Sequence, residues 1–220
     1  VNTVTAFSGT SPAYFVKGLI EGINVSPSQP NAITISGVSA TTPGIRGIIN
    51  SQDGNILGKT NVFIEGRREL VRTEETTLGN LSADANIAEA KKLYPNQIIL
   101  SLKNGGGIRA AIGVVSAVGG NASLLPPASN PGAGKVSGDV SQLDVLNSLR
   151  FNNSLSVGDI SATNILAVLN HGVRASATGA TPGQFAQVGG LRFSWNPSLP
   201  AGSRVRSVAV VDDMGKVLDV

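Results

Sequence analysis

The chain has 220 residues but contains no cysteine, only one histidine and few aromatic residues. Without cysteine it can form no disulfide, no zinc–thiolate site and no cysteine nucleophile. The single histidine, His171, falls in the last turn of a predicted helix, where a partial positive charge is favourable. One histidine cannot build an ordinary transition-metal site, and no nucleophile motif accompanies it. We therefore predict neither catalytic residues nor a metal or cofactor site within this chain.

Charge is also scarce. Charged residues make up 14% of the chain, against about 25% in an average soluble domain. Hydrophobic residues make up 41%, which is enough for a sizeable core and argues against disorder. The net charge is +3, without a dense run of basic residues, and the tightest basic cluster is Arg67, Arg68 and Arg72. A small anionic ligand explains this cluster as well as a polymer would, and the dispersed basic residues are too weak an argument to predict a nucleic-acid partner.

Long apolar runs are missing as well, since no stretch approaches the ~18 consecutive apolar residues of a membrane span. The chain opens at Val1 rather than at a methionine and shows no signal peptide, so we interpret it as a processed fragment. Residues 1–55 are rich in Ser, Thr, Gly and Pro with weak periodicity. This segment is interpreted as the tail of an upstream domain and a connector, with a disordered linker as the alternative.

After residue 55 the spacing of apolar residues becomes regular enough to predict individual strands and helices. Strands are predicted at 61–65, 97–102, 155–157, 188–195 and 205–211, with a hairpin turn at 212–215. Helices are predicted over 78–93, from Asp139, and from an N-cap at Ser161. Helices and strands alternate without regular βαβ spacing, so we predict an α+β fold with a mixed β-sheet flanked by helices.

The strongest local motif is NGGGIR at residues 104–109, directly after a predicted apolar strand. Consecutive glycines let the backbone turn sharply and bring N–H groups close to a ligand, here at Gly106 and Gly107. Arg109 can hold phosphate or carboxylate oxygens with its forked guanidinium, and Asn104 lies at the same rim. A glycine-rich turn with a solvated arginine is the alternative.

Three further features each have a structural alternative. Arg68 and Arg72 are four residues apart and would share one face of a helical turn, to bind one anion or to form a solvated basic face. Phe151 lies among polar residues and is suited either to stacking on a flat ring or to covering the core. The loop at residues 132–135 (GAGK) fails the phosphate-loop pattern, because Val136 replaces the required Ser or Thr.

Taken together, the motifs resemble those of the bacterial 5'-nucleotidases. The family stretch ETNLGNLIADA is similar to residues 75–85 (ETTLGNLSADA), and NGGGIR occurs at 104–109. GDV at 138–140, FNN at 151–153, LNHGV at 169–173 and GQFAQVGGL at 183–191 follow in the family's order and spacing. The resemblance covers residues 56–220 and is to the C-terminal, substrate-recognition domain of these metallophosphoesterases.

The resemblance implies the nucleotide-recognition part of a secreted phosphohydrolase, periplasmic or extracellular. Two divalent metal ions would be held by an upstream metallophosphatase domain, so that this chain alone would bind a nucleotide or other phosphate ester without hydrolysing it. Phosphate would be held by the arginines and the glycine-rich bend, with Asn104 beside them. The base would stack on Phe151, and Asn153 would lie near its edge. The implied binding residues are Arg68, Arg72, Asn104, Gly106, Gly107, Arg109, Phe151 and Asn153.

The chain departs from the family pattern in three places. Arg150 and Asn152 replace a Pro and a Gly beside the stacking Phe, and Thr77 replaces an Asn. The family's second aromatic belongs to a GGDG-type segment that would follow Val220, so we expect a truncated domain. An interaction or surface module that kept the fold without binding nucleotides is the alternative function, and a different phosphate ester is a third possibility.

Overall fold

A computed structural model describes residues 23–25, 33–35, 45–117, 121–151 and 153–219. The first two segments are strands β1 (Ile23–Val25) and β2 (Ile33–Ile35), which pair with each other in antiparallel orientation. The helices that follow are α1 (Ile45–Asp53), α2 (Arg68–Val71), α3 (Thr77–Leu93), α4 (Gln142–Ser148) and α5 (Ala162–Val173), with 3-10 turns η1 (Gly105–Gly107) and η3 (Pro131–Ala133). The remaining strands are β3 (Ile56–Lys59), β4 (Ser101–Asn104), β5 (Val114–Ser116), β6 (Ser123–Leu125), β7 (Asp139–Ser141), β8 (Ala186–Gly189), β9 (Leu191–Trp195), β10 (Val205–Val211) and β11 (Val217–Asp219).

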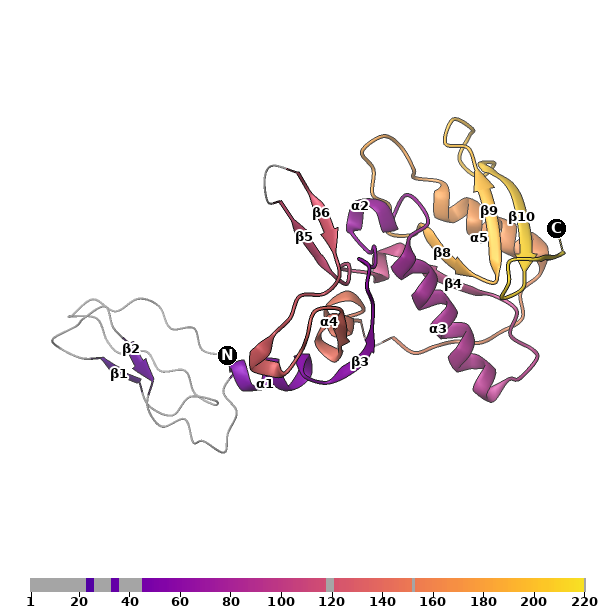
Figure 1. Cartoon of the computed structure of the whole chain (residues 1–220). Helices are drawn as coiled ribbons and strands as arrows, with labels where there is room; N and C mark the ends of the chain where they lie inside the picture. The colour runs from indigo at the N-terminus through magenta and orange to yellow at the C-terminus, as the bar shows by residue number, and fades with distance from the viewer. Residues whose placement is uncertain (1–22, 26–32, 36–44, 118–120, 152, 220) are drawn as a thin grey trace.

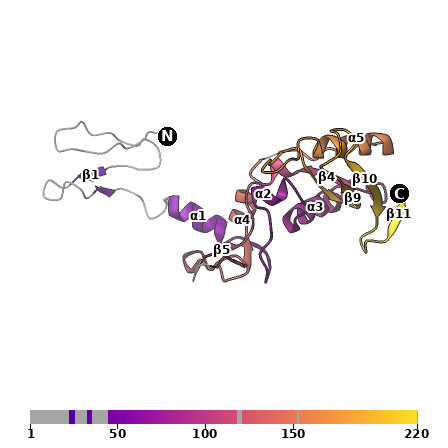
Figure 2. The ribbon, with the colours of Figure 1, turned by 90° about the horizontal axis from the view of Figure 1, so that it is seen from above.

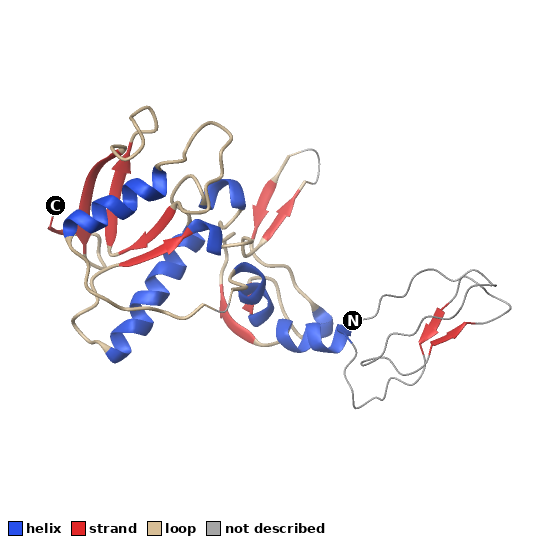
Figure 3. Cartoon of the chain, turned by 180° about the vertical axis from the view of Figure 1, so that it is seen from behind, coloured by secondary structure: helices blue, strands red, loops and turns tan. Residues whose placement is uncertain are grey.

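The strands form small antiparallel sheets in place of one large sheet. Within the described ranges, β3 pairs with β7, β4 with β8, and β5 with β6, while β9, β10 and β11 form a three-stranded sheet. Helices and strands lie together throughout the body (Figure 3), but along the chain the strands β4 to β7 and β8 to β11 follow one another without an α-helix between them. The predicted α+β class with helices flanking the strands is confirmed, but the pairings found among the described strands are all antiparallel and do not form the predicted mixed sheet.

Two helices lie on opposite sides of the strands in the C-terminal half (Figures 1 and 2). Helix α5 contributes Ile165 and Leu169 to a hydrophobic core with Ala186 and Leu191 from β8 and β9. Helix α3 lies against β4 and β8 on the other side. This layering places β4 and β8 at the centre of the body, and β4 leads directly into the NGGG turn.

A second core lies beneath that turn. Val71 of α2, Leu78 of α3, and Ile108 and Ile112 after η1 are buried together. At about 25 cal/mol per Å² of buried apolar surface, such contacts are the main source of local stability. The core therefore joins α2, which carries Arg68, to the segment that carries Arg109.

Several predicted elements are confirmed. The predicted helix at 78–93 is α3, and the helix that follows Ser161 is α5, whose N-cap accepts a hydrogen bond from the Asn164 N–H at 3.3 Å. The strands predicted at 188–195 and 205–211 are β8–β9 and β10, and residues 212–215 form the turn to β11.

Other boundaries differ. The predicted strand at 61–65 forms a single bridge, between Ile64 and Ile112, and the regular strand is β3 at 56–59. The strand predicted at 97–102 begins only at Ser101, and described residues 153–160 contain no strand. Residue 139 begins the short strand β7, and α4 starts three residues later. Short apolar runs do not by themselves specify a pairing partner, and the partner decides where a strand begins.

The GAGK loop holds α1 onto the body. Lys135 is buried, and its ammonium nitrogen lies 2.8 Å from Asp53 Oδ1 and 2.7 Å from Asp144 Oδ2. Ser141 completes the cluster, since its hydroxyl donates to Asp53 at 2.7 Å. Because Asp53 is the last residue of α1, the lysine also offsets the unfavourable position of a carboxylate at a helix C-terminus. The loop that superficially resembles a phosphate loop is therefore a structural anchor.

Candidate functional site

The predicted arginines gather around α2. Arg68 is the exposed first residue of this helix, and Arg72 follows its last residue and is only 7% exposed. One Arg72 Nη1–H donates weakly to the Thr181 carbonyl at 3.4 Å, while its buried Nε has no hydrogen-bond partner in the described part of the chain. Burial lowers the pKa of Arg72, and the positive charges of Arg68 and Arg109 lower it further. Arg68 and Arg109 therefore both lie within electrostatic range of Arg72.

The NGGGIR motif forms a tight bend that is packed against two other segments. The Gly105 N–H donates to the Phe185 carbonyl at 2.7 Å, and the Gly106 N–H donates to the Gly183 carbonyl at 2.9 Å. A β-carbon at Gly105 would overlap the carbonyl of Val71. The glycines thus allow close approach of backbones, and the Gly106 N–H, which we expected near a ligand, is already bonded within the fold.

A small hollow of about 120 Å³ lies beside this bend. It brings together four of the predicted residues: Asn104, Gly107, Phe151 and Asn153. The remaining lining residues are Asn86, Lys103, Leu149, Ser154 and Leu155. Residues that are distant in sequence therefore surround one cavity, as a binding site requires.

Arg109 connects the hollow to the arginines. Its guanidinium carbon lies 5.8 Å from the centre of the Phe151 ring, within the range of a cation–π contact. The Phe151 side chain is 51% exposed, so it is a surface aromatic and not a core residue. The structure thus places the guanidinium of Arg109 next to an exposed ring, which suits a ligand with an anionic group and a flat aromatic part.

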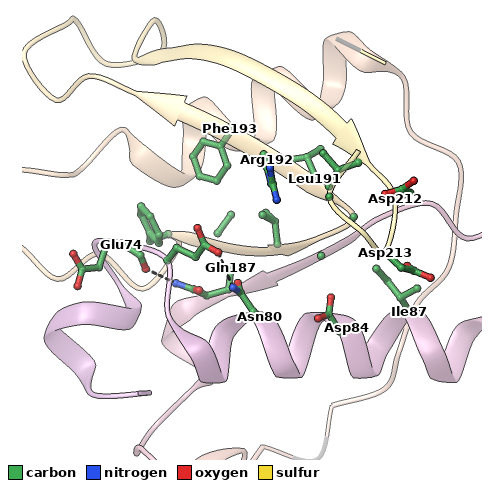
Figure 4. Close-up of a pocket in the computed structure, with 18 of the residues that line it drawn as sticks. Glu74, Asn80, Asp84, Ile87, Gln187, Leu191, Arg192, Phe193, Asp212 and Asp213 are labelled. Atoms are coloured by element: carbon green, nitrogen blue, oxygen red, sulfur yellow. Dashed lines mark hydrogen bonds between the residues drawn. The ribbon is translucent and has the colours of Figure 1, made fainter. Parts of the chain in front are cut away.

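A larger groove of about 900 Å³ lies elsewhere, between α3 and strands β8 to β10 (Figure 4). Asp84 and Asn80 point into it from α3, while Asp212 and Asp213 lie at one end and Glu74 at the other. Its charged lining consists of Glu74, Glu75, Asp84, Asp212 and Asp213 against Lys91 and Arg192. An excess of carboxylates repels phosphate. We therefore place the candidate anion site at the arginines and the small hollow.

Two further findings concern metals and membranes. Within residues 45–117, 121–151 and 153–219, and in the short strands before them, no group of three or more His, Cys, Asp and Glu side chains could hold a metal ion. In the same described part of the chain, no helix combines the length and the apolar character needed to cross a bilayer.

Sequence reasoning missed three residues that shape the site. Lys103 lines the hollow, Gly183 receives hydrogen bonds from the NGGG bend, and Gln187 is 1% exposed and bonds to the segment after α2. Gly183 and Gln187 belong to the GQFAQVGGL motif, so a signal for them was present. Their partners are more than 70 positions away in sequence, and a linear pattern does not identify such pairs.

Comparison with known proteins gives a consistent result. The family described as 5'-nucleotidase, C-terminal domain, matches residues 56–219. The trifunctional nucleotide phosphoesterase protein YfkN of Bacillus subtilis is 33% identical over 159 residues, which cover 72% of this chain and 9% of that protein. Human 5'-nucleotidase is 24% identical over 199 residues, covering 86% of this chain and 31% of that protein.

Solved structures agree with this. The 5'-nucleotidase precursor of Thermus thermophilus superimposes with a TM-score of 0.59 at 32% identity, covering 78% of this chain and 29% of that one. The NAD nucleotidase of Haemophilus influenzae superimposes with a TM-score of 0.52 at 18% identity, covering 80% of this chain and 28% of the nucleotidase chain. At this low identity the likeness supports the fold alone. The chain spans less than a third of the length of each of these four proteins.

Proposed function

The chain belongs to the 5'-nucleotidase C-terminal domain family, and from this premise we propose that it recognises nucleotides for a 5'-nucleotidase-type phosphohydrolase. In this proposal the phosphate is held by Arg68, Arg72 and Arg109, and the base stacks on Phe151. Asn104, Gly106, Gly107 and Asn153 complete the proposed binding residues.

The environment of Arg72 is the observation that carries this proposal. Arg72 is buried, forms no ion pair with a carboxylate in the described part of the chain, and is acted on by the charges of Arg68 and Arg109, which is unfavourable in the free protein. A bound phosphate would supply the missing negative charge and accept the unpaired Nε–H. Charge-assisted hydrogen bonds of this kind contribute about 1.5–3 kcal/mol each.

The exposed ring of Phe151 supports the second half of the proposal. A base stacked on an aromatic side chain gains about 1–3 kcal/mol. Because Arg109 lies over the Phe151 ring and its charge also acts on Arg72, a nucleotide could place its phosphate and its base on neighbouring groups. An inorganic phosphate would use only the first of these contacts.

Hydrolysis is proposed to depend on a different part of the protein. The relatives are several times longer than this chain, and we propose that two divalent metal ions are held by an upstream metallophosphatase domain of which residues 1–55 form the tail and connector. Bound metal ions would generate the attacking hydroxide and neutralise charge on the phosphate. We place the whole enzyme in the periplasm or outside the cell, in keeping with relatives such as a snake venom 5'-nucleotidase.

Calorimetric titration of the full chain tests the binding proposal. AMP, a UDP-sugar and inorganic phosphate are added separately to the wild type and to Arg109→Ala. We expect AMP and the UDP-sugar to bind more tightly than phosphate, and Arg109→Ala to weaken all three by roughly tenfold or more. Absence of heat with every anion would favour the alternative, an interaction module without nucleotide binding.

A hydrolysis assay tests the second part. AMP is incubated with the purified chain and added Mg²⁺, Mn²⁺ or Zn²⁺, and released phosphate is measured. We expect binding without turnover. Sustained phosphate release by the pure chain would contradict the proposal that hydrolysis depends on a separate upstream domain.

A further inference from the structure

Lys103 lies at the candidate base site and has no assigned role. It is the third residue of β4, directly opposite Gln187 of β8. Side chains alternate along a strand, so Lys103 shares a face with Ser101. Asn86 of α3 donates to the Ser101 hydroxyl at 3.5 Å, so this face is turned towards α3. Lys103 and Asn86 accordingly line the same hollow as Phe151.

Among the residues that the structure describes, no group pairs with the ammonium of Lys103. The side chain is half-buried, and neither an ion pair nor a hydrogen bond engages its nitrogen within the described segments. None of the nine residues that line the hollow is acidic. By contrast, Lys135, Lys59, Lys91 and Lys92 each face a carboxylate. An ammonium on a half-buried side chain that has no carboxylate partner among the described residues favours a ligand that brings acceptor oxygens.

Lys103 is the one charged residue among the nine that line the hollow. Of the other polar side chains, Asn104 and Asn86 are engaged within the fold, while Asn153 and Ser154 are exposed. The Asn104 side-chain amide donates to the Gly183 carbonyl at 3.4 Å, and the Asn86 amide is engaged with Ser101. A lysine ammonium offers three donors and no acceptor. The volume of about 120 Å³ is well below the ~300–1,000 Å³ of sites that enclose a whole small ligand. The hollow therefore suits the edge of one ring.

We propose that Lys103 is a specificity residue that selects nucleotides whose base presents a carbonyl oxygen to the hollow beside Phe151. This inference depends on the proposed function, because it assumes that the base stacks on Phe151. Hypoxanthine, guanine and uracil carry ring carbonyls that accept from an ammonium. Adenine carries an amino group at the corresponding position, which is a donor and would face another donor.

IMP and AMP provide the sharpest test, since they differ in having an oxo or an amino group at C6. Both are titrated calorimetrically into the full chain as wild type, Lys103→Met, Lys103→Arg and Lys216→Met. Lys216 is an exposed lysine in the β10–β11 turn, and its substitution removes one positive charge at a distance from the hollow. Far-UV circular dichroism and thermal melts establish that each variant is folded.

We expect the wild type to bind IMP about tenfold more tightly than AMP, the effect of one hydrogen bond to a charged group. Lys103→Met should lose this preference and keep its affinity for AMP, whereas Lys103→Arg and Lys216→Met should retain the preference. Equal binding of IMP and AMP by the wild type, or a preference that persists in Lys103→Met, would overturn the inference alone. If Lys103→Met weakens IMP, AMP and inorganic phosphate equally, Lys103 is a phosphate contact and the inference is also wrong. If neither nucleotide binds the wild type, the proposed function fails together with it.

Discussion

Gln187 on β8 donates its side-chain amide to the carbonyl oxygen of Val71, 3.0 Å away and 116 positions earlier in the sequence. The same amide donates to the Glu74 carbonyl at 2.7 Å, and the side-chain oxygen accepts from the Thr76 N–H at 3.2 Å. One buried glutamine thus binds both sides of the segment that carries Arg72. These hydrogen bonds fix the position of the segment around Arg72 relative to strand β8.

Replacing Gln187 with leucine should destabilise the chain strongly. The substitution leaves two carbonyls and one N–H without their partner, and each buried unsatisfied group costs about 1–3 kcal/mol. We expect the free energy of unfolding to fall by about 3 kcal/mol or more, measured by urea denaturation. Gln97→Leu is the matched control, because Gln97 is exposed, and it should change stability little. Similar stabilities of the two variants would show that the Gln187 hydrogen bonds contribute nothing net.

The glycines of the NGGG motif should differ in their tolerance of alanine. A β-carbon at Gly105 would overlap the Val71 carbonyl, whereas one at Gly107 would meet Asn104 Oδ1 at 3.4 Å, an ordinary contact distance. Gly105→Ala should therefore lower the unfolding free energy by about 2 kcal/mol or more through overpacking. Gly107→Ala should change it by less than about 1 kcal/mol, because alanine also restricts the unfolded chain. Thermal denaturation of both variants is sufficient, and equal losses would contradict the assigned geometry.

Replacing Arg72 should weaken nucleotide binding without lowering the stability of the fold. In the free protein its buried guanidinium has few partners, so Arg72→Met should leave the unfolding free energy unchanged or raise it by about 1 kcal/mol. Affinity for AMP should fall by roughly tenfold or more, since charge-assisted hydrogen bonds to phosphate are lost. Arg206, an exposed residue of β10, provides the control Arg206→Met. A destabilised Arg72→Met that still binds AMP normally would assign Arg72 a structural role only.

The anchor between α1 and the body should make stability pH-dependent at both extremes. Burial alone would raise the pKa of Asp53, but hydrogen bonds from Lys135, Asn130 and Ser141 outweigh it and hold this pKa below its ordinary value of 3.8. Burial alone would lower the pKa of Lys135, but Asp144 and Asp53 raise it above 10.5. The Asp53 contribution is complete above its unfolded pKa and is lost as the pH falls through the lower folded pKa. The Lys135 contribution is complete below pH 10.5 and is lost as the pH rises through the higher folded pKa.

Stability from this anchor should accordingly be constant from about pH 5 to pH 9. Lys135→Met leaves two carboxylates near each other without their cation, and should lower the unfolding free energy by about 3 kcal/mol at pH 7. Lys59→Met is the control, because the Lys59 side chain is 75% exposed in its contact with Asp139, and it should resemble the wild type. Urea denaturation between pH 3 and pH 11 provides the measurement. If Lys135→Met keeps wild-type stability at pH 7, α1 is not held in this way.

Much of the fold was readable from the sequence, because the signals were local. Helix α3 follows from apolar spacing and ends before a Tyr-Pro pair, and α5 follows from the Ser161 cap. The buried face of α3 was not evident from the spacing of large apolar residues, since Leu81 is 52% exposed while Gly79 and Ala83 are buried. Gly79 is needed there because a β-carbon would overlap the Gln187 side chain. Which face of a helix is buried depends on the strand that lies against it.

By itself, the sequence determined the α+β class, the family and the residue types available for an anion site, because these depend on composition, local periodicity and motif order. The tertiary structure alone decided that Arg72 is buried with no counter-ion among the described residues, that Lys103 lines the hollow beside Phe151, and that Lys135 anchors α1. Each of these depends on burial or on groups supplied by segments distant along the chain, such as Lys135 and Asp53, 82 positions apart. Solvation and charge pairing arise from three-dimensional neighbours, and local sequence patterns do not specify those neighbours.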